Sequence, residues 1–220
     1  MFPSTKLTTA GEHLFIFSGL AGQLEAVLTV PPDSNKELIA LLGHPHSLQG
    51  GTMNNKVVTT MARSFKELKI ASIRFNFRGV GQSEGIYDAG VGESEDMLAL
   101  MRLCQKEMAA NPGFIFAGFS FGSYVAYRAA AQAKSELLIT IAPPVHHYDY
   151  LEFSAPKPWV IMQGDEDEVV PLAAVLDFAA PFSPALPLYR FAATSHFFHG
   201  KLLELKTSLI EVVRTQAAKL

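Results

Sequence analysis

The pentapeptide Gly118 to Gly122 places Ser120 between two glycines in the pattern Gly-x-Ser-x-Gly. A buried apolar run, Phe114 to Ala117, leads into it, and a segment of helical composition, Tyr124 to Ala133, follows it. This order of strand, sharp turn and helix is what a nucleophile elbow requires, because the turn exposes the serine hydroxyl at the edge of a sheet. A serine that merely begins a helix would fit the pentapeptide alone, but the motif and its surroundings together favour a nucleophile.

A serine hydroxyl becomes a good nucleophile only when an oriented base removes its proton, so an acid and a histidine are expected downstream. Four consecutive acidic residues, Asp165 to Glu168, follow the apolar run Trp159 to Gln163 after a single glycine, Gly164. We expect Asp167 to orient the base, because it lies three residues past that glycine and just before another apolar stretch. Asp165 is the alternative, and the other acids are expected to be solvated.

Two histidines compete for the role of the base. His196 heads the loop after the apolar run Leu188 to Phe191, and His199 follows three residues later. We expect His199 to lie within or at the start of the final helix, whereas a catalytic base belongs at the end of a strand. His196 is therefore the predicted base. The chain order of Ser120, Asp167 and His196 is the one expected when the elbow lies in the middle of a sheet.

Acyl transfer also needs hydrogen-bond donors for the negative oxygen that develops on the substrate carbonyl. The backbone N–H of Phe121, directly after the serine, is the first predicted donor. The second should come from the loop Gly43 to Gly51, which follows the apolar run Leu38 to Leu42. Because Pro45 has no N–H, we expect the backbone N–H of His46 to be the second donor of this oxyanion hole.

The segments that must position these residues alternate between short apolar runs and stretches of helical period. Two antiparallel strands, His13 to Ser18 and Gln23 to Val30, are expected first, joined by a turn. Buried strands are then expected at Leu38 to Leu42, Ile70 to Phe77, Phe114 to Phe119, Leu137 to Ala142, Trp159 to Gln163 and Leu188 to Phe191. Apolar residues recur at helical spacing within Val57 to Leu68, Met97 to Met108 and Leu202 to Val212.

This alternation predicts an α/β fold. The expected architecture is a mostly parallel central sheet of about eight strands with an antiparallel start and helices on both faces. In such a sheet the ligand site lies at the carboxyl ends of the strands, which is where the four catalytic segments would meet.

The composition limits the classes of protein. The 220 residues are 49% hydrophobic and 18% charged, with a net charge of −3, which is too apolar for a disordered chain and too charged for a membrane bundle. The length favours a single domain over residues 1–220. Without a basic excess, nucleic acid is not an expected partner, and neither is a membrane. The single cysteine, Cys104, excludes an internal disulfide and suits the cytoplasm.

Two other kinds of site receive weaker support. The segment Arg78 to Gly85 comes close to a dinucleotide-binding Gly-x-Gly-x-x-Gly motif, but Glu84 occupies the place of the third glycine. The pair His44 and His46 and the adjacent pair His146 to His147 lack the i, i+4 spacing of a helical zinc site, although a His-x-His pair could bind a metal if carboxylates converged on it. We expect no organic cofactor and no metal.

With these residues placed, the chain resembles the α/β-hydrolase superfamily, and more closely its small, cap-less branch of esterase-like and dienelactone-hydrolase-like proteins. The resemblance spans nearly the whole chain, and its motifs are His44 to His46 with Gly50 and Gly51, Arg74 to Gly85, Gly118 to Gly122, Gly164 to Asp167 and Ser195 to His199. It implies that Ser120 is the nucleophile, Asp167 the acid and His196 the base.

Two details of the chain bear on this resemblance. Many relatives have His-Gly where this chain has His44 and Pro45, so the first oxyanion loop departs from the common pattern. Relatives with bulky pockets often insert a helical cap after the sixth strand, but here only Pro143 to Pro158 separates two expected strands. That connection is too short for a large lid, and we expect an open pocket.

The predicted function is that of a serine hydrolase that cleaves carboxylic esters of small acyl substrates through an acyl-enzyme. Thioesterase, lactonase and peptidase activities stay open within the same class. The alternative from another class is a non-catalytic module that keeps the fold and uses its pocket to bind a ligand or a partner.

Overall fold

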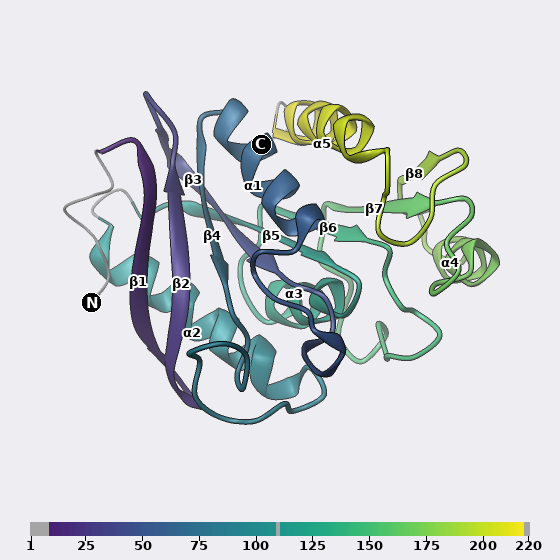
Figure 1. The fold of residues 1–220 in the computed structure, drawn as a ribbon. Helices are drawn as coiled ribbons and strands as arrows, with labels where there is room; N and C mark the ends of the chain where they lie inside the picture. Colours follow the sequence, from purple (N-terminus) through teal and green to yellow (C-terminus); the bar gives the residue numbers. More distant parts are fainter. Residues whose placement is uncertain (1–8, 109–110, 218–220) are drawn as a thin grey trace.

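The computed structural model describes residues 9–108 and 111–217. At the centre of this part of the chain lies one eight-stranded sheet with the strand order β1-β2-β4-β3-β5-β6-β7-β8 (Figure 1). The strands are β1 (Gly11–Gly19), β2 (Gly22–Val30), β3 (Asn35–Gly43), β4 (Ile70–Phe75), β5 (Gly113–Phe119), β6 (Leu137–Ile141), β7 (Trp159–Gly164) and β8 (Leu188–Phe191). β2 pairs antiparallel with both β1 and β4, and the other neighbouring strands pair parallel.

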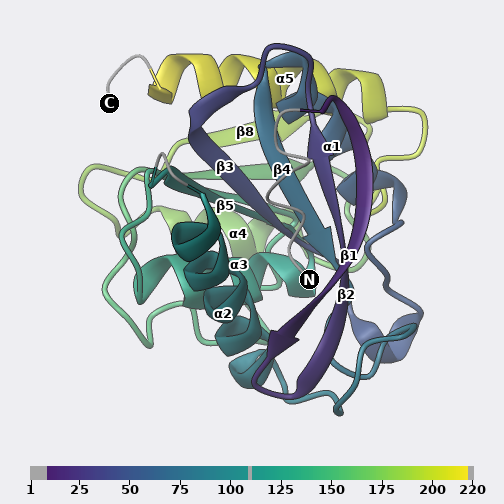
Figure 2. The ribbon, with the colours of Figure 1, turned by 90° about the vertical axis from the view of Figure 1, so that its left-hand side faces the viewer.

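Helices cover both faces of this sheet. They are α1 (Lys56–Glu67), α2 (Val91–Glu107), α3 (Phe121–Ala131), α4 (Leu172–Ala179) and α5 (Leu202–Ala217), with a short 3-10 turn, η2 (Ser47–Gln49). In both ribbon views α1 and α5 lie on one side of the sheet, and α2 and α3 lie on the other (Figures 1 and 2). The predicted α/β fold with a mostly parallel sheet, an antiparallel start and two covered faces is therefore confirmed.

The central strands are buried on both sides, which divides the core in two. Along β5, Phe114 and Phe116 pack with the side chains of α2 and α3, whereas Ile115 and Ala117 pack with those of α1 and α5. This alternation follows from the two-residue period of a strand, and an apolar run on both faces is typical of a parallel sheet. The two cores hold the carboxyl end of β5, where the candidate nucleophile lies, in a fixed place.

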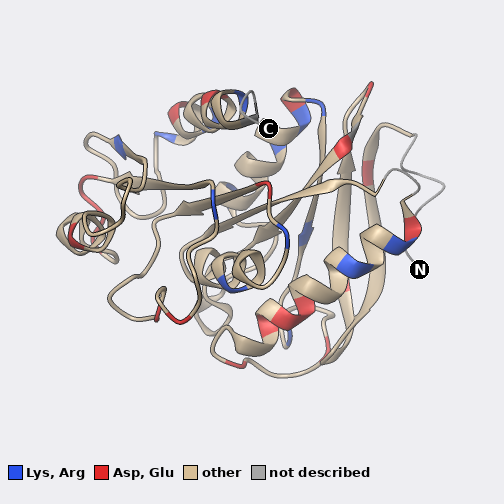
Figure 3. Cartoon of the chain, turned by 180° about the vertical axis from the view of Figure 1, so that it is seen from behind, with Lys and Arg blue, Asp and Glu red and all other residues tan. Residues whose placement is uncertain are grey.

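The charges on α2 match the dipole of the helix. Figure 3 shows acidic residues near the start of this helix and basic residues farther along it. Glu93 lies in the first turn, where its carboxylate accepts a 2.9 Å hydrogen bond from the N–H of Gly90, and Lys106 lies in the last turn. A helix carries partial positive charge at its N-terminus and partial negative charge at its C-terminus, so both placements stabilise the helix.

Two element predictions differ from the structure. α3 begins at Phe121 rather than at Tyr124, so the serine directly precedes the first helical residue. α4 was not predicted at all. Its eight residues are apolar almost throughout, and only Val175 and Ala179 are buried. Such a segment lacks the apolar stripe by which amphipathic helices are recognised.

The connection between β6 and β7, residues 142–158, contains no helix. The predicted absence of a large cap is confirmed, because the connection consists only of turns, bends and irregular backbone. Among the described helices, none is long and apolar enough to cross a membrane.

Candidate active site

Ser120 occupies the sharp turn between β5 and α3. Its backbone angles, φ 54° and ψ −125°, lie in a region that residues other than glycine rarely adopt. The two flanking glycines make the turn possible. A Cβ on Gly118 would collide with the backbone of Gly122, and a Cβ on Gly122 would collide with the backbone of Gly43 at the end of β3. The sequence prediction of a strand, a tight turn and a helix at this serine agrees with this geometry.

The side chains of Ser120, His196 and Asp167 form a continuous chain of hydrogen-bond contacts. The Nε2 atom of His196 is 3.1 Å from the Oγ of Ser120, and its Nδ1 is 2.8 Å and 3.0 Å from the two carboxylate oxygens of Asp167. Since a carboxylate only accepts hydrogen bonds, Nδ1 carries the imidazole proton when the ring is neutral. Nε2 is then free to accept the proton of the serine hydroxyl.

The loop after β7 fixes the carboxylate of Asp167. Its Oδ1 accepts hydrogen bonds from the N–H groups of Val169, at 2.9 Å, and Val170, at 2.7 Å. Its Oδ2 accepts a 3.1 Å hydrogen bond from the side-chain amide of Gln163. The carboxylate is fully buried. It therefore has donors on every side and one orientation toward the imidazole of His196.

The rival acid and the rival base lie outside this chain of contacts. Asp165 forms two 2.9 Å hydrogen bonds with the guanidinium of Arg190. His199 is exposed, and its ring packs on Phe197. The expectation that His199 lies within or at the start of the final helix is wrong, because α5 begins at Leu202. The turn that precedes the helix carries this histidine to the surface.

Two residues that support the site were missed by the sequence analysis. Gln163 holds Asp167, and the carboxylate of Glu168 accepts a 3.1 Å hydrogen bond from the backbone N–H of His196. Glu168, which was expected to be solvated, therefore connects the loop after β7 to the loop after β8. A glutamine at the end of a strand and a glutamate in an acidic run have no distinctive pattern in a sequence.

The loop after β3 is held by a buried histidine. The Nε2 of His44 accepts a 2.9 Å hydrogen bond from the N–H of Phe77, and its Nδ1 donates to the carbonyl oxygen of Pro45 at 2.7 Å. Burial lowers the pKa of His44 to about 3, so the ring is neutral at pH 7 and its proton stays on Nδ1. Through these two hydrogen bonds, the neutral ring holds the loop after β3 against the loop after β4.

The two residues that carry the predicted oxyanion donors are neighbours in the structure. The rings of His46 and Phe121 are in contact, with centroids 5.1 Å apart. Within the described part of the chain, the backbone N–H of neither residue has a hydrogen-bond acceptor. The carbonyl oxygen of His46, by contrast, accepts from the N–H groups of Gln49 and Gly51, both at 3.0 Å. Two unpaired donors thus accompany the serine at the carboxyl edge of the sheet.

Aromatic rings pack against the side chains of these two residues. The ring of His46 stacks on that of Tyr87 at 4.9 Å, and its Nε2 is 3.2 Å from the phenol oxygen. The ring of Tyr148 packs against that of Phe121 at 5.6 Å. His44 and His46 therefore use their ring nitrogens on protein groups rather than converging on a metal. Among residues 9–108 and 111–217, no group of three His, Cys, Asp or Glu side chains is placed to hold a metal ion.

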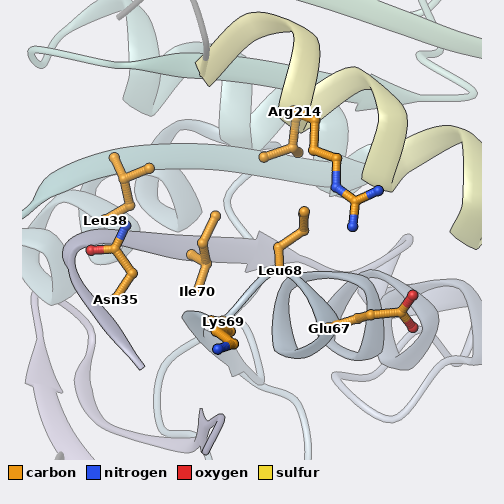
Figure 4. A pocket seen from close by; sticks show the side chains of 8 residues that line it. Asn35, Leu38, Glu67, Leu68, Lys69, Ile70 and Arg214 are labelled. Carbon is orange, nitrogen blue, oxygen red and sulfur yellow. The ribbon is translucent and has the colours of Figure 1, made fainter. Parts of the chain in front are cut away.

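A pocket of about 550 Å³ lies at the opposite end of the sheet, and Figure 4 shows the side chains that line it. It lies where β3 and β4 begin, between the end of α1 and the last turns of α5, and is lined by Asn35, Leu38, Glu67, Leu68, Lys69, Ile70, Val213 and Arg214. These residues include no serine and no histidine. The candidate active site is therefore the carboxyl edge of the sheet and not this pocket.

No protein-family model matches the chain. An α/β serine hydrolase without a lid from Xanthomonas campestris superposes on the structure with a TM-score of 0.89 and 40% sequence identity, covering 94% of this chain and 95% of the relative. An α/β serine hydrolase homologue from Coxiella burnetii gives a TM-score of 0.85 and 42% identity, covering 91% and 97%. An uncharacterized protein of Rickettsia prowazekii is 36% identical over 167 residues, 73% of this chain and 69% of the relative. Similarity of this extent, together with the short connection between β6 and β7, shows that the chain belongs to the α/β serine hydrolases without a lid.

Proposed function

We propose that this hydrolase cleaves carboxylic esters with small acyl groups through an acyl-enzyme intermediate. The observation that carries the proposal is the chain of contacts from Asp167 through His196 to Ser120, at 2.8 Å and 3.1 Å. A serine with an oriented imidazole beside it has the parts that nucleophilic acyl transfer needs.

In the acylation step, the Oγ of Ser120 attacks the carbonyl carbon of the ester while the Nε2 of His196 takes the hydroxyl proton. The π electrons of the carbonyl move to its oxygen, whose negative charge the N–H groups of Phe121 and His46 stabilise. The carbonyl then reforms, the bond to the alkoxide breaks, and His196 gives its proton to the departing oxygen. Alcohol leaves, and the acyl group stays on the serine.

In the deacylation step, water takes the place of the alcohol. His196 removes a proton from the water as its oxygen attacks the acyl carbon, and the same two N–H groups stabilise the second oxyanion. The bond to Ser120 then breaks, and its Oγ receives the proton from His196. Asp167 keeps the imidazole in one tautomer and stabilises its positive charge in both steps. These steps use only groups of the chain, so the proposal includes no metal and no organic cofactor.

The short connection between β6 and β7 supports small-molecule esters as substrates, because a hydrolase without a lid has no cap to enclose a large apolar group. Thioesters, lactones and peptides would follow the same steps and define the competing activities within the class. A cytoplasmic location is proposed as well, supported by the single cysteine, Cys104, which is buried and unpaired.

The proposal is tested with the purified protein. It should hydrolyse p-nitrophenyl acetate and be labelled at Ser120 by a fluorophosphonate, and Ser120→Ala should abolish both reactions. Ser208→Ala, a half-buried position on α5, is the matched control and should retain both. A folded wild-type protein that reacts with neither probe would instead favour a module that only binds a ligand or a partner.

A further inference from the structure

The phenol of Tyr150, a residue of the connection between β6 and β7, reaches the nucleophile turn. Its Oη is 2.7 Å from the Oγ of Ser123, and that Oγ is 2.6 Å from the backbone carbonyl oxygen of Ser120. Ser123 is completely buried and Tyr150 is 2% exposed. The two hydroxyls and the carbonyl therefore form a relay that no solvent interrupts.

The chemistry of the three groups sets the direction of this relay. The carbonyl oxygen of Ser120 can only accept, so the hydroxyl proton of Ser123 points at it. The Oγ of Ser123 must then accept from the phenol of Tyr150. Burial raises the pKa of Tyr150 well above its ordinary value, which keeps the phenol protonated and able to donate. The backbone N–H of Ser123 donates to the same carbonyl at 2.8 Å.

The carbonyl at the end of the relay is part of the peptide unit that contains the N–H of Phe121. A trans peptide unit is planar, and its C=O and N–H bonds point in opposite directions. Holding the oxygen of Ser120 therefore fixes the direction of the N–H that is proposed to bind the oxyanion. Hydrogen bonds to the carbonyl also polarise the amide and make its N–H a stronger donor.

Packing keeps the phenol of Tyr150 in place. Its ring lies against those of Tyr127 at 5.1 Å, Tyr124 at 5.3 Å, Phe178 at 5.8 Å and Trp159 at 6.1 Å. Four rings from α3, β7 and α4 thus surround it. A hydroxyl held by so many contacts is preorganised, and it needs no reordering when charge develops on the substrate.

We propose that Tyr150 is a positioning residue for ester hydrolysis, whose hydroxyl, acting through Ser123, aims and polarises the Phe121 N–H toward the oxyanion. This inference rests on the proposed function, since it assigns a role within the same reaction. The relay acts on a group that meets full negative charge only in the transition state. Its loss should therefore lower kcat and leave KM nearly unchanged.

The first test is Tyr150→Phe, which keeps the ring and removes only the hydroxyl. With p-nitrophenyl acetate we expect kcat to fall about tenfold and KM to change by less than about twofold. The affinity for a trifluoromethyl ketone, which a serine nucleophile converts to a tetrahedral oxyanion, should fall by a similar factor. These readouts separate a positioning role from a merely structural one.

The matched control is Tyr127→Phe. The phenol of Tyr127 accepts from the N–H of Phe153 at 3.1 Å and donates to its carbonyl at 3.0 Å, so the substitution removes two hydrogen bonds to the same connection and none from Ser123. We expect kcat and ketone affinity to stay within about twofold of the wild type. Equal losses in the two variants would overturn the proposal, because they would trace the effect to anchoring of the connection.

Ser123→Ala provides an independent route if Tyr150→Phe folds poorly. It removes the middle of the relay and should lower kcat and ketone affinity at least as much, and adding Tyr150→Phe to it should cause little further loss. Wild-type kcat and ketone affinity in both single variants, or fully additive losses in the double variant, would refute the relay. A wild-type protein that cleaves no ester would instead refute the proposed function, so the two failures are distinct.

Discussion

Asp165 and Asp167 are two residues apart on the loop after β7, yet their carboxylates have different partners. Asp167 is buried against the imidazole of His196, and Asp165 pairs with the guanidinium of Arg190. The same substitution at the two positions therefore separates a group that orients the base from one that pairs with strand β8 near the surface.

Asp167→Asn should lower kcat/KM by about 10³- to 10⁴-fold, because an amide can donate to Nδ1 and so favours the wrong tautomer of the imidazole. Asp165→Asn should change kcat/KM by less than about threefold, since exposed ion pairs contribute little. Initial rates with p-nitrophenyl acetate at pH 7.5 measure both. A larger loss in Asp165→Asn would transfer the role of the acid to that residue.

His196→Ala should lower kcat by about 10³-fold or more, since no other base contacts the Oγ of Ser120 in the described part of the chain. His199→Ala is the control on the same loop. Its side chain is exposed, and we expect activity within about twofold of the wild type. The rate of fluorophosphonate labelling provides a second measurement. Comparable losses in both variants would contradict the assignment of the base.

His44 should make the fold sensitive to acid. Its pKa is about 3 in the folded protein, against an ordinary value of 6.5, so between these pH values the unfolded chain binds a proton that the folded chain does not. The free energy of unfolding therefore falls as the pH drops below about 6.5. The His44→Gln variant lacks this titrating group, so this pH-dependent part of its free energy of unfolding is absent.

Urea denaturation at pH 6.5 and pH 5.0 measures the difference. Wild-type protein should lose about 1.5 kcal/mol more of its unfolding free energy over this interval than His44→Gln does. His199→Ala, which changes an exposed histidine, should behave like the wild type. Equal pH dependence in all three proteins would show that His44 is not the group that titrates.

Gly122→Ala should destabilise the protein by about 3 kcal/mol, because the new methyl group would collide with the backbone of Gly43 and force the end of β3 away from α3. Gly113→Ala is the matched control, since the nearest atoms to its methyl group belong to the side chains of Glu136 and Leu38 and not to the backbone. That change should cost less than about 1 kcal/mol. Urea midpoints measure both, and a similar shift in the two variants would contradict the close approach of β3 and α3.

The parts of this protein that follow from local sequence could be predicted. The run Phe114 to Ala117, the glycines at 118 and 122 and the helix after them fix the place of Ser120 without reference to distant residues. The strand ends before Asp167 and His196 could be recognised for the same reason. Parallel strands then bring these ends to one edge.

The rest depends on contacts between loops. Whether Glu168 meets the backbone of His196, or Gln163 meets Asp167, is decided by how the loops after β7 and β8 fold over each other. Tyr150 is a stronger example, since its partner Ser123 lies 27 residues earlier on a helix. No periodicity or motif reports such a pair, because each residue type is ordinary in its own segment.

The connection between β6 and β7 also limits where foreign sequence could be grafted into this hydrolase. Side-chain contacts join residues 150–153 to α3, among them Tyr150 with Ser123, Glu152 with Arg128 and Phe153 with Tyr127. An insertion within residues 150–153 would break these contacts and disturb the turn that carries Ser120. Ser154 is exposed and follows these contacts, so an insertion at this residue would leave them and the turn intact.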